Sequence, residues 1–199
     1  MVKTSGPNRR GNKTRTGRLR IVAGKWRTRL LPIADVPGLR PTSERIRETL
    51  FNWLAPTIEG SRCLDLFAGT GALGFEALSR GAAAVTFIDK SAAAAENLRQ
   101  SVATLGAAGA TVIEGDAVSY LSEGRGEQYD VVFLDPPFSN NLPEDLCRLL
   151  ALSDVLAHGA RVYLERDRGQ PRPRLPEGWS TIREKSAGKV SYALISTGP

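Results

Sequence analysis

The residues best suited to chemistry follow a strand-like run at 131–134, which ends directly in Asp135-Pro136-Pro137-Phe138. Two consecutive prolines lack backbone N–H groups and have fixed φ angles, so this loop should hold its carbonyl groups rigidly outward. Asp135 and the Pro136 carbonyl would then accept the two hydrogens of an amino group on a planar base, and Phe138 would stack on that base. These contacts would direct the nitrogen lone pair toward a methyl donor. The alternative is a proline-rich turn after a buried strand.

A glycine loop follows an earlier strand-like run at 62–67. Gly69, Gly71 and Gly74 match the pattern G-x-G-x-x-G. In a doubly wound sheet such glycines let the backbone approach an adenosine cofactor at the topological switch point. A tight strand-to-helix turn without a ligand would produce the same pattern.

Three carboxylates lie at predicted strand ends, where such a cofactor would bind. Asp65 could accept a hydrogen bond from a ligand amino group but would repel a pyrophosphate, which favours S-adenosylmethionine over NAD. Asp89, about 20 residues after the glycines, is placed to accept the ribose hydroxyls of either cofactor. Asp116 could accept from the adenine amino group, with the Ala117 amide beside it, or could cap a helix.

Short apolar runs alternate with helical segments from residue 62 onward. Strands are expected at 62–67, 84–88, 111–114, 129–134 and 161–165, and helices at 71–80, 92–105, 117–123 and 142–156. This alternation predicts right-handed crossovers and an α/β fold whose parallel sheet carries helices on both faces. Two final runs, 180–184 and 190–196, predict a closing hairpin that adds an antiparallel strand.

Positive charge is concentrated at the N-terminus. Residues 1–30 contain ten Lys or Arg and no acid, which leaves 17 basic against 21 acidic residues, a net charge of −4, in the remaining 169. Such an arm is expected to contact a polyanion by neutralising phosphates, whereas a solvated tail is the alternative. The tail 1–17 should be disordered, and 18–23 should pair with 27–33 in a hairpin. The candidate RNA-binding cations here are Arg18, Arg20, Lys25, Arg27 and Arg29.

A helix is expected after the loop at 34–41, with Thr42 as its cap. Ile46, Leu50, Trp53 and Leu54 share one apolar face, while Arg45 and Glu48, with Arg47 beside them, lie on the opposite one. Hairpin and helix together would form an N-terminal extension, residues 18–60, that faces the substrate. The main domain would then span 61–199.

Composition excludes several classes of protein. The 199 residues, 41% hydrophobic, are typical of one ordinary soluble domain. No apolar run approaches the roughly 20 residues that cross a bilayer, and no secretion signal is evident. Two cysteines and one histidine cannot supply the usual four Cys/His zinc ligands and argue against a Ser-His-Asp hydrolase. Cys63 and Cys147 are expected to be reduced, packed thiols of a cytoplasmic protein.

Several motifs resemble known enzymes. The run 135–138 resembles the [DN]-P-P-[YF] signature of amino-directed methyltransferases that use S-adenosylmethionine, and residues 67–74 resemble their glycine motif. DNA adenine, RNA guanine and protein glutamine methyltransferases share that signature. Residues 20–24 with Trp26, 38–54 and 183–192 are similar to the RsmD family, bacterial enzymes that methylate the exocyclic N2 of one guanine in 16S ribosomal RNA. The resemblance covers residues 18–196.

The resemblance implies a Rossmann-like class I methyltransferase sheet of seven strands, the last antiparallel. A monomer is expected separately, because the sequence has no spare apolar helix that would indicate an obligate dimer. The implied substrate is 16S ribosomal RNA in the assembling small subunit, with the target guanine turned out of its stack. Near the pocket mouth it would place Arg40, Thr42, Arg45 and Arg47, for which a solvated helix face is the alternative. The residues implied for S-adenosylmethionine are Asp65, Phe67, Gly69, Gly71, Asp89, Asp116 and Ala117.

Other functions stay open at this point. A DNA adenine methyltransferase would need a separate target-recognition region, for which the short N-terminal extension leaves no room. A protein glutamine methyltransferase would not need the basic arm. A non-catalytic assembly factor that binds ribosomal RNA would not need an intact 135–138 run, and Asp65 disfavours an NAD oxidoreductase.

Overall fold

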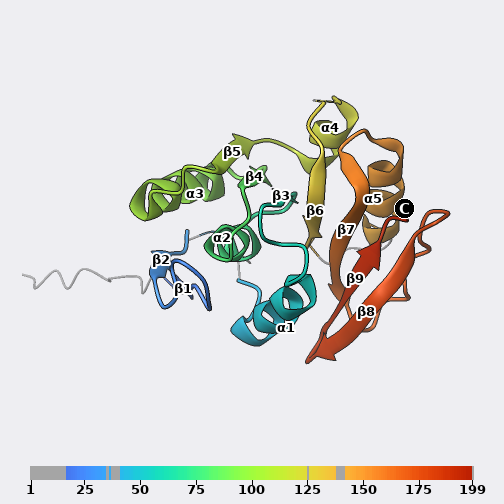
Figure 1. Cartoon of the computed structure of the whole chain (residues 1–199), viewed down its shortest axis with the longest axis horizontal. Helices are drawn as coiled ribbons and strands as arrows, with labels where there is room; N and C mark the ends of the chain where they lie inside the picture. Colours follow the sequence, from blue (N-terminus) through green and yellow to red (C-terminus); the bar gives the residue numbers. More distant parts are fainter. Residues whose placement is uncertain (1–16, 35, 37–40, 125, 138–141, 199) are drawn as a thin grey trace, which may run out of the picture.

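A computed structural model describes residues 17–34, 36, 41–124, 126–137 and 142–198 of the chain. They form one mixed sheet of seven strands with helices on both faces, and a separate two-stranded hairpin (Figure 1). Nearly all of the tail expected to be disordered, together with Arg40 and Phe138, lies outside the described residues. Within the described ranges, no helix is long and apolar enough to cross a membrane.

The sheet has the strand order β5-β4-β3-β6-β7-β9-β8. Neighbouring strands pair in parallel except at β9, which runs antiparallel to both β7 and β8. The predicted α/β sheet with an antiparallel last strand is therefore confirmed. The strands are β3 Arg62–Asp65, β4 Ala84–Asp89, β5 Ala110–Glu114, β6 Tyr129–Leu134, β7 Leu156–Asp167, β8 Ser180–Ala187 and β9 Val190–Ser196.

Each face of the sheet has its own apolar core, because successive strand residues point to opposite faces. Phe87 and Phe133 pack with helices α2 (Ala72–Ser79) and α3 (Ala92–Leu105). Their neighbours Ile88 and Leu134 pack instead with α4 (Ala117–Ser122) and α5 (Leu142–Leu152). The central strands are buried on both sides, as a parallel sheet requires.

The predicted bounds of β6 and α3 agree with the structure, but α5 ends earlier than the expected helix 142–156. Ser153 terminates it, since both its backbone N–H and its hydroxyl donate to the Leu150 carbonyl, at 3.2 and 2.8 Å. The chain then joins the sheet at once, where the Tyr129 N–H donates to the Val155 carbonyl at 2.8 Å. As a result β7 begins well before the expected strand 161–165.

The N-terminal hairpin has shorter strands than expected, β1 (Arg18–Arg20) and β2 (Leu30–Pro32). The backbone N–H groups of Val22 and Ala23 do not continue the pairing, because they donate to the Glu76 carboxylate on α2 at 2.8 and 3.0 Å. Gly24 approaches α2 so closely that a Cβ there would lie 1.8 Å from the Ser79 carbonyl oxygen. The hairpin is thus docked on α2 through its backbone.

Arg47 is buried, which corrects its predicted place on an outer, RNA-facing surface. Its side chain is only 2% exposed, and Nη1 donates to Glu76 Oε2 at 3.0 Å. Nη2 donates to the Arg20 carbonyl at 2.8 Å, and Nε donates to the Thr42 carbonyl at 3.1 Å. The guanidinium is therefore taken up by contacts inside the fold.

Helix α1 (Glu44–Leu54) is capped by Ser43 rather than by Thr42, since the Ser43 hydroxyl accepts from the Ile46 N–H at 3.3 Å. Its apolar side is broader than expected and includes the buried Phe51. Trp53, partly buried, stacks on Tyr192 of β9 with ring centroids 5.5 Å apart. Helix α1 (cyan) consequently lies between α2 and β9 in Figure 1.

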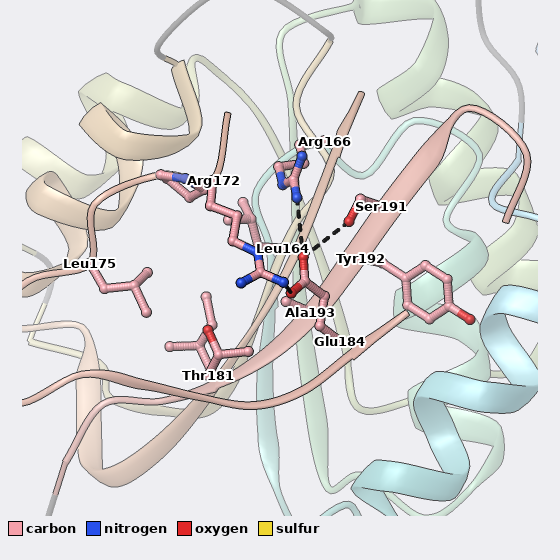
Figure 2. A pocket seen from close by; sticks show the side chains of 11 residues that line it. Leu164, Arg166, Arg172, Leu175, Thr181, Glu184, Ser191, Tyr192 and Ala193 are labelled. Atoms are coloured by element: carbon pink, nitrogen blue, oxygen red, sulfur yellow. Dashed lines mark hydrogen bonds and ion pairs between the residues drawn. The ribbon is translucent and has the colours of Figure 1, made fainter. Parts of the chain in front are cut away.

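The closing hairpin β8–β9 is tied to the segment before it by Glu184 (Figure 2). This carboxylate accepts from Arg166 at 3.1 Å and from Ser191 at 3.2 Å, and it pairs with Arg172 at 2.7 Å. These groups line a small cavity of about 70 Å³. Tyr192 points away from this cluster in Figure 2, toward the face where α1 packs.

Replacing Glu76 should destabilise the whole fold. Glu76→Gln leaves the buried Arg47 cation without its carboxylate, and removing one partner of such a pair costs about 3–5 kcal/mol. Urea unfolding followed by circular dichroism measures this loss. Asp145→Asn is the control, because its ion pair with Arg148 is exposed and should contribute less than about 1 kcal/mol. Equally small losses in the free energy of unfolding for Glu76→Gln and Asp145→Asn would contradict the importance of Glu76.

Candidate active site

A cavity of about 930 Å³ opens where the parallel strands end at their carboxyl termini. The loops after β3, β4, β5 and β6 all contribute to its wall, as does the start of α1. Ligands of open α/β sheets bind at this edge, next to the switch point between strands whose crossovers run in opposite directions. The cavity is large enough for a nucleoside-sized ligand.

The glycine loop forms one wall, but its three glycines have different roles. Gly69 lines the cavity, together with Phe67. Gly71 has a φ of 76° and a Cβ there would lie 2.4 Å from the Phe75 ring, while a Cβ on Gly74 would lie 2.2 Å from the Phe87 ring. Gly71, expected to bind the cofactor, and Gly74 are therefore required for the turn and for packing α2 on the sheet.

Asp65 is buried at the end of β3 and lines the cavity. Its Oδ2 accepts from the Gly74 N–H at 3.2 Å. Burial, with the charges of Asp135 and Asp89 adding to it, raises the pKa of Asp65 to about 8. A cationic ligand group next to this carboxyl would favour its ionised form, as expected for an ammonium.

Asp89 and Asp116 also line the cavity, and both hold the backbone of neighbouring loops. Asp89 accepts from the Gly69 N–H at 2.7 Å and from the Ser91 N–H at 2.8 Å. Asp116 caps α4, since its Oδ1 accepts from the N–H groups of two residues in the first turn at 2.9 and 3.1 Å. The cap that was one alternative for Asp116 is present, and the buried Ala117 follows it in the cavity wall.

Asp135 and Pro136 line the cavity at the end of β6, the strand next to β3, with Pro137 beside them. The Thr42 hydroxyl donates to Asp135 Oδ2 at 3.2 Å. Burial raises the pKa of Asp135 to about 6, although this hydrogen bond opposes the shift. Thr42, expected to cap a helix and to lie near the substrate, thus contacts the main candidate for catalysis directly.

Glu165 is a site residue that sequence reasoning missed. It lies in β7, is 3% exposed, lines the cavity and accepts from the Tyr163 hydroxyl at 2.6 Å. Burial and the charge of Asp135 raise the pKa of Glu165 to about 8. Asp65 and Asp135 were identified because each is an acid at the end of a buried strand. The same rule applied to Glu165, which ends the expected strand 161–165.

The predicted RNA-binding cations fall into two groups. Arg47 is buried in its ion pair with Glu76 and cannot meet a ligand from solvent. The cations whose side chains are exposed on the N-terminal hairpin and on α1 are Arg18, Arg20, Lys25, Arg27, Arg29 and Arg45. Their exposure allows contact with phosphates, and Arg20 also pairs with Glu44 at 3.9 Å.

The cavity thus brings together acceptors for an ammonium, for hydroxyls and for a planar amine. Asp65, Asp89, Asp116, Asp135 and Pro136 all line it, and Asp65 and Asp135 lie at the ends of the neighbouring strands β3 and β6. Two ligands could therefore meet in this one cavity. This arrangement suits the transfer of a group from a nucleoside-like donor to an amine.

The raised pKa of Asp65 makes the stability of the ligand-free protein depend on pH. An unfolded aspartate ionises at about pH 4, whereas Asp65 in the fold keeps its proton until about pH 8. Between these values the unfolded state binds fewer protons, so stability falls as pH rises, by up to about 1.4 kcal/mol per pH unit. Urea unfolding between pH 5 and 8 should show a smaller fall for Asp65→Asn than for the unchanged protein.

Asp154→Asn is the matched control, because Asp154 is exposed and should leave the pH dependence as it was. A pH dependence that Asp65→Asn does not alter would show that Asp65 is ionised throughout this range.

Comparison with known proteins agrees with this geometry. The family model described as "Conserved hypothetical protein 95" matches residues 19–196. A protein of Escherichia coli K12 named ribosomal RNA small subunit methyltransferase D is 48% identical over 183 residues, which cover 92% of each chain. The protein of the same name from Haemophilus influenzae is 44% identical and covers 98% of each chain.

Solved structures are similar as well. The yhhF protein of Escherichia coli superposes with a TM-score of 0.86 at 45% identity, covering 92% of this chain and 99% of that one. A structure from Haemophilus influenzae gives a TM-score of 0.80 at 41% identity, covering 92% of this chain and all of the other. The resemblance to the RsmD family is confirmed, and the chain belongs to that family.

Proposed function

We propose that the protein transfers a methyl group from S-adenosylmethionine to the exocyclic N2 of a guanine in 16S ribosomal RNA. The observation that carries this proposal is the presence of Asp135 and Pro136 in the same cavity as the glycine loop and its three acids. The names of the relatives support ribosomal RNA of the small subunit as the substrate. The choice of the guanine N2 amine as the target rests on the resemblance to the RsmD family and on the acceptor pair formed by Asp135 and the Pro136 carbonyl.

The side of the cavity formed by the glycine loop suits the cofactor. Asp65 would face its ammonium group, Asp89 its ribose hydroxyls and Asp116 its adenine amine, with Phe67 and Gly69 in the same wall. S-adenosylmethionine, when bound, supplies an electrophilic methyl group. The protein's part is to hold the ligand in one orientation next to the acceptor amine.

Asp135 and the Pro136 carbonyl would prepare the amine. The lone pair of an exocyclic guanine nitrogen is conjugated with the ring, so the free amine is a poor nucleophile. Accepting its two hydrogens localises the lone pair on nitrogen, and the same acceptors stabilise the positive charge that develops there. A pKa of about 6 keeps Asp135 mainly ionised at neutral pH, and the Thr42 hydroxyl orients the carboxylate.

The exposed cations of the N-terminal extension, residues 18–60, would contact the RNA backbone. The hairpin carries exposed Arg18, Arg20, Lys25, Arg27 and Arg29. Such contacts position a protein on RNA without reading bases, while the target base itself is turned out of its stack into the cavity. We place the reaction in the cytoplasm, on an assembling small subunit, with the protein acting as a monomer.

Loss of Asp135 should impair turnover far more than cofactor affinity. Asp135→Ala removes an acceptor that acts in the transition state, so kcat should fall by about 100-fold or more while the Kd for S-adenosylhomocysteine stays within about twofold. Labelled methyl transfer to small subunits purified from a strain lacking the gene measures kcat, and calorimetry measures binding.

Asp89→Asn is the matched comparison, because it changes an acid on the cofactor side and should raise the cofactor KM with a smaller effect on kcat. Methyl labelling of the RNA by the unchanged protein but not by Asp135→Ala supports the proposal. Cofactor binding without RNA labelling would contradict it and would indicate a DNA or protein acceptor, or a non-catalytic assembly factor.

Charge reversal on the hairpin should weaken RNA binding uniformly. The double variant Arg27→Glu and Arg29→Glu should reduce affinity for small-subunit RNA and lower the slope of log K against log salt by about 1 per lost phosphate contact. Filter binding at several salt concentrations measures both. Arg148→Glu, on the exposed side of α5, is the control. An unchanged salt slope in the double variant would place the RNA on another surface.

A further inference from the structure

Glu165 has no part in the mechanism above, yet it shares the cavity wall with Asp135. Leu134 and Leu164 are paired in the parallel register of β6 and β7, so Asp135, which follows β6, lies beside Glu165, which is still within β7. Both line the 930 Å³ cavity. A ligand group held by Asp135 would therefore have Glu165 next to it.

The orientation of the Glu165 carboxyl is fixed by Tyr163. The tyrosine hydroxyl donates to Glu165 Oε1 at 2.6 Å, and Tyr163 itself is fully buried against the Phe133 ring. A carboxylate has acceptor sites on two oxygens, so the hydrogen bonds from Tyr163 and Thr42 still leave capacity for a ligand. Because Glu165 is only 3% exposed, solvent is a poor partner for that remaining capacity.

Two carboxyl groups enclosed together are costly unless a partner donates hydrogens to both. The charge of Asp135 adds to burial in raising the pKa of Glu165, while hydrogen bonds from Tyr163 and Thr42 oppose the shift. With a pKa of about 8, Glu165 is mainly protonated at neutral pH in the ligand-free protein, and hydrogen bonds donated by a ligand favour its ionised form. The wall is consequently suited to a ligand that presents several adjacent donors along one edge.

Among the nucleobases with an exocyclic amine, guanine alone has such an edge in its neutral form. Its N1–H lies directly beside the N2 amine, giving adjacent donors. Adenine and cytosine each place an acceptor ring nitrogen beside the amine, and a carboxylate would repel that nitrogen. A site built to accept a donor discriminates strongly against a substrate that lacks it, because its buried group is then left unpaired.

We propose that Glu165 is the residue that selects guanine, by accepting the N1–H of the target base while Asp135 and the Pro136 carbonyl accept its amine. This inference rests on the proposed function and adds a residue that reads the base. Tyr163 acts as a positioning residue, since it holds the Glu165 carboxylate without contacting the base.

The test replaces the target guanine with 2-aminopurine, which keeps the exocyclic amine but has an acceptor in place of N1–H. Small-subunit RNA carrying either base at the methylated position, assembled with its proteins, serves as substrate. The unchanged protein should prefer guanine by about 100-fold or more in kcat/KM. In Glu165→Gln this preference should fall at least tenfold, because the amide can donate to the ring nitrogen of 2-aminopurine.

The amines of guanine and 2-aminopurine differ in intrinsic reactivity, but this difference is the same for the unchanged protein and for Glu165→Gln. It therefore cancels when the preferences of the two proteins are compared. Tyr163→Phe is the matched control, which should lower the rate but keep the preference for guanine. Melting temperature and binding of S-adenosylhomocysteine establish that each variant is folded. Equal loss with both substrates in Glu165→Gln would show a merely structural role and overturn the inference.

Indifference of the unchanged protein to the two bases would overturn it as well, without any variant. Absence of methyl transfer to the guanine substrate would instead contradict the proposed function itself. The two failures are therefore distinguishable in one set of measurements.

Discussion

The buried carboxylate of Glu76 is the interaction on which the arrangement of the N-terminal part depends. It lies on α2 and binds the hairpin backbone at Val22 and Ala23 and the side chains of Arg47 and Arg80. Arg47 in turn donates to the Thr42 carbonyl, and the Thr42 hydroxyl donates to Asp135. One chain of contacts therefore runs from the hairpin, through the start of α1, to the acceptor at the active site.

A buried ion pair of this kind contributes more to a unique arrangement than to net stability, because the cost of desolvating both charges offsets much of their attraction. Here its partners come from the hairpin, α1 and α2, which otherwise meet through apolar side chains such as Leu19, Leu50 and Phe75. Apolar contacts alone would let the hairpin, α1 and α2 slide against one another. The hydrogen-bonded pair of Arg47 and Glu76 requires one alignment of these elements. That alignment joins the hairpin, which carries exposed cations, to the cavity through one continuous set of contacts.

The features that follow from local pattern, namely the regular elements and the acids at strand ends, could be predicted from the sequence. The bounds of β6 and α3, the order of strands and helices, and the cavity positions of Asp65, Asp89 and Asp135 followed from local pattern. Arg47 was misplaced because its partner Glu76 lies 29 residues away and no local pattern shows it. Thr42 was expected to cap α1 because Thr and the neighbouring Ser43, the actual cap, are both suited to that role. Its contact with Asp135, 93 residues away in the sequence, is formed only in the fold.

The central claim is that this acid-lined cavity directs a methyl group to the N2 amine of guanine. The most direct measurement is mass spectrometry of nucleosides from small-subunit RNA after reaction with S-adenosylmethionine carrying a deuterated methyl group. The heavy methyl group should be found in N2-methylguanosine, at a single position of the RNA. Heavy methyl in an adenine nucleoside, or on the ring nitrogens of guanine, would contradict it.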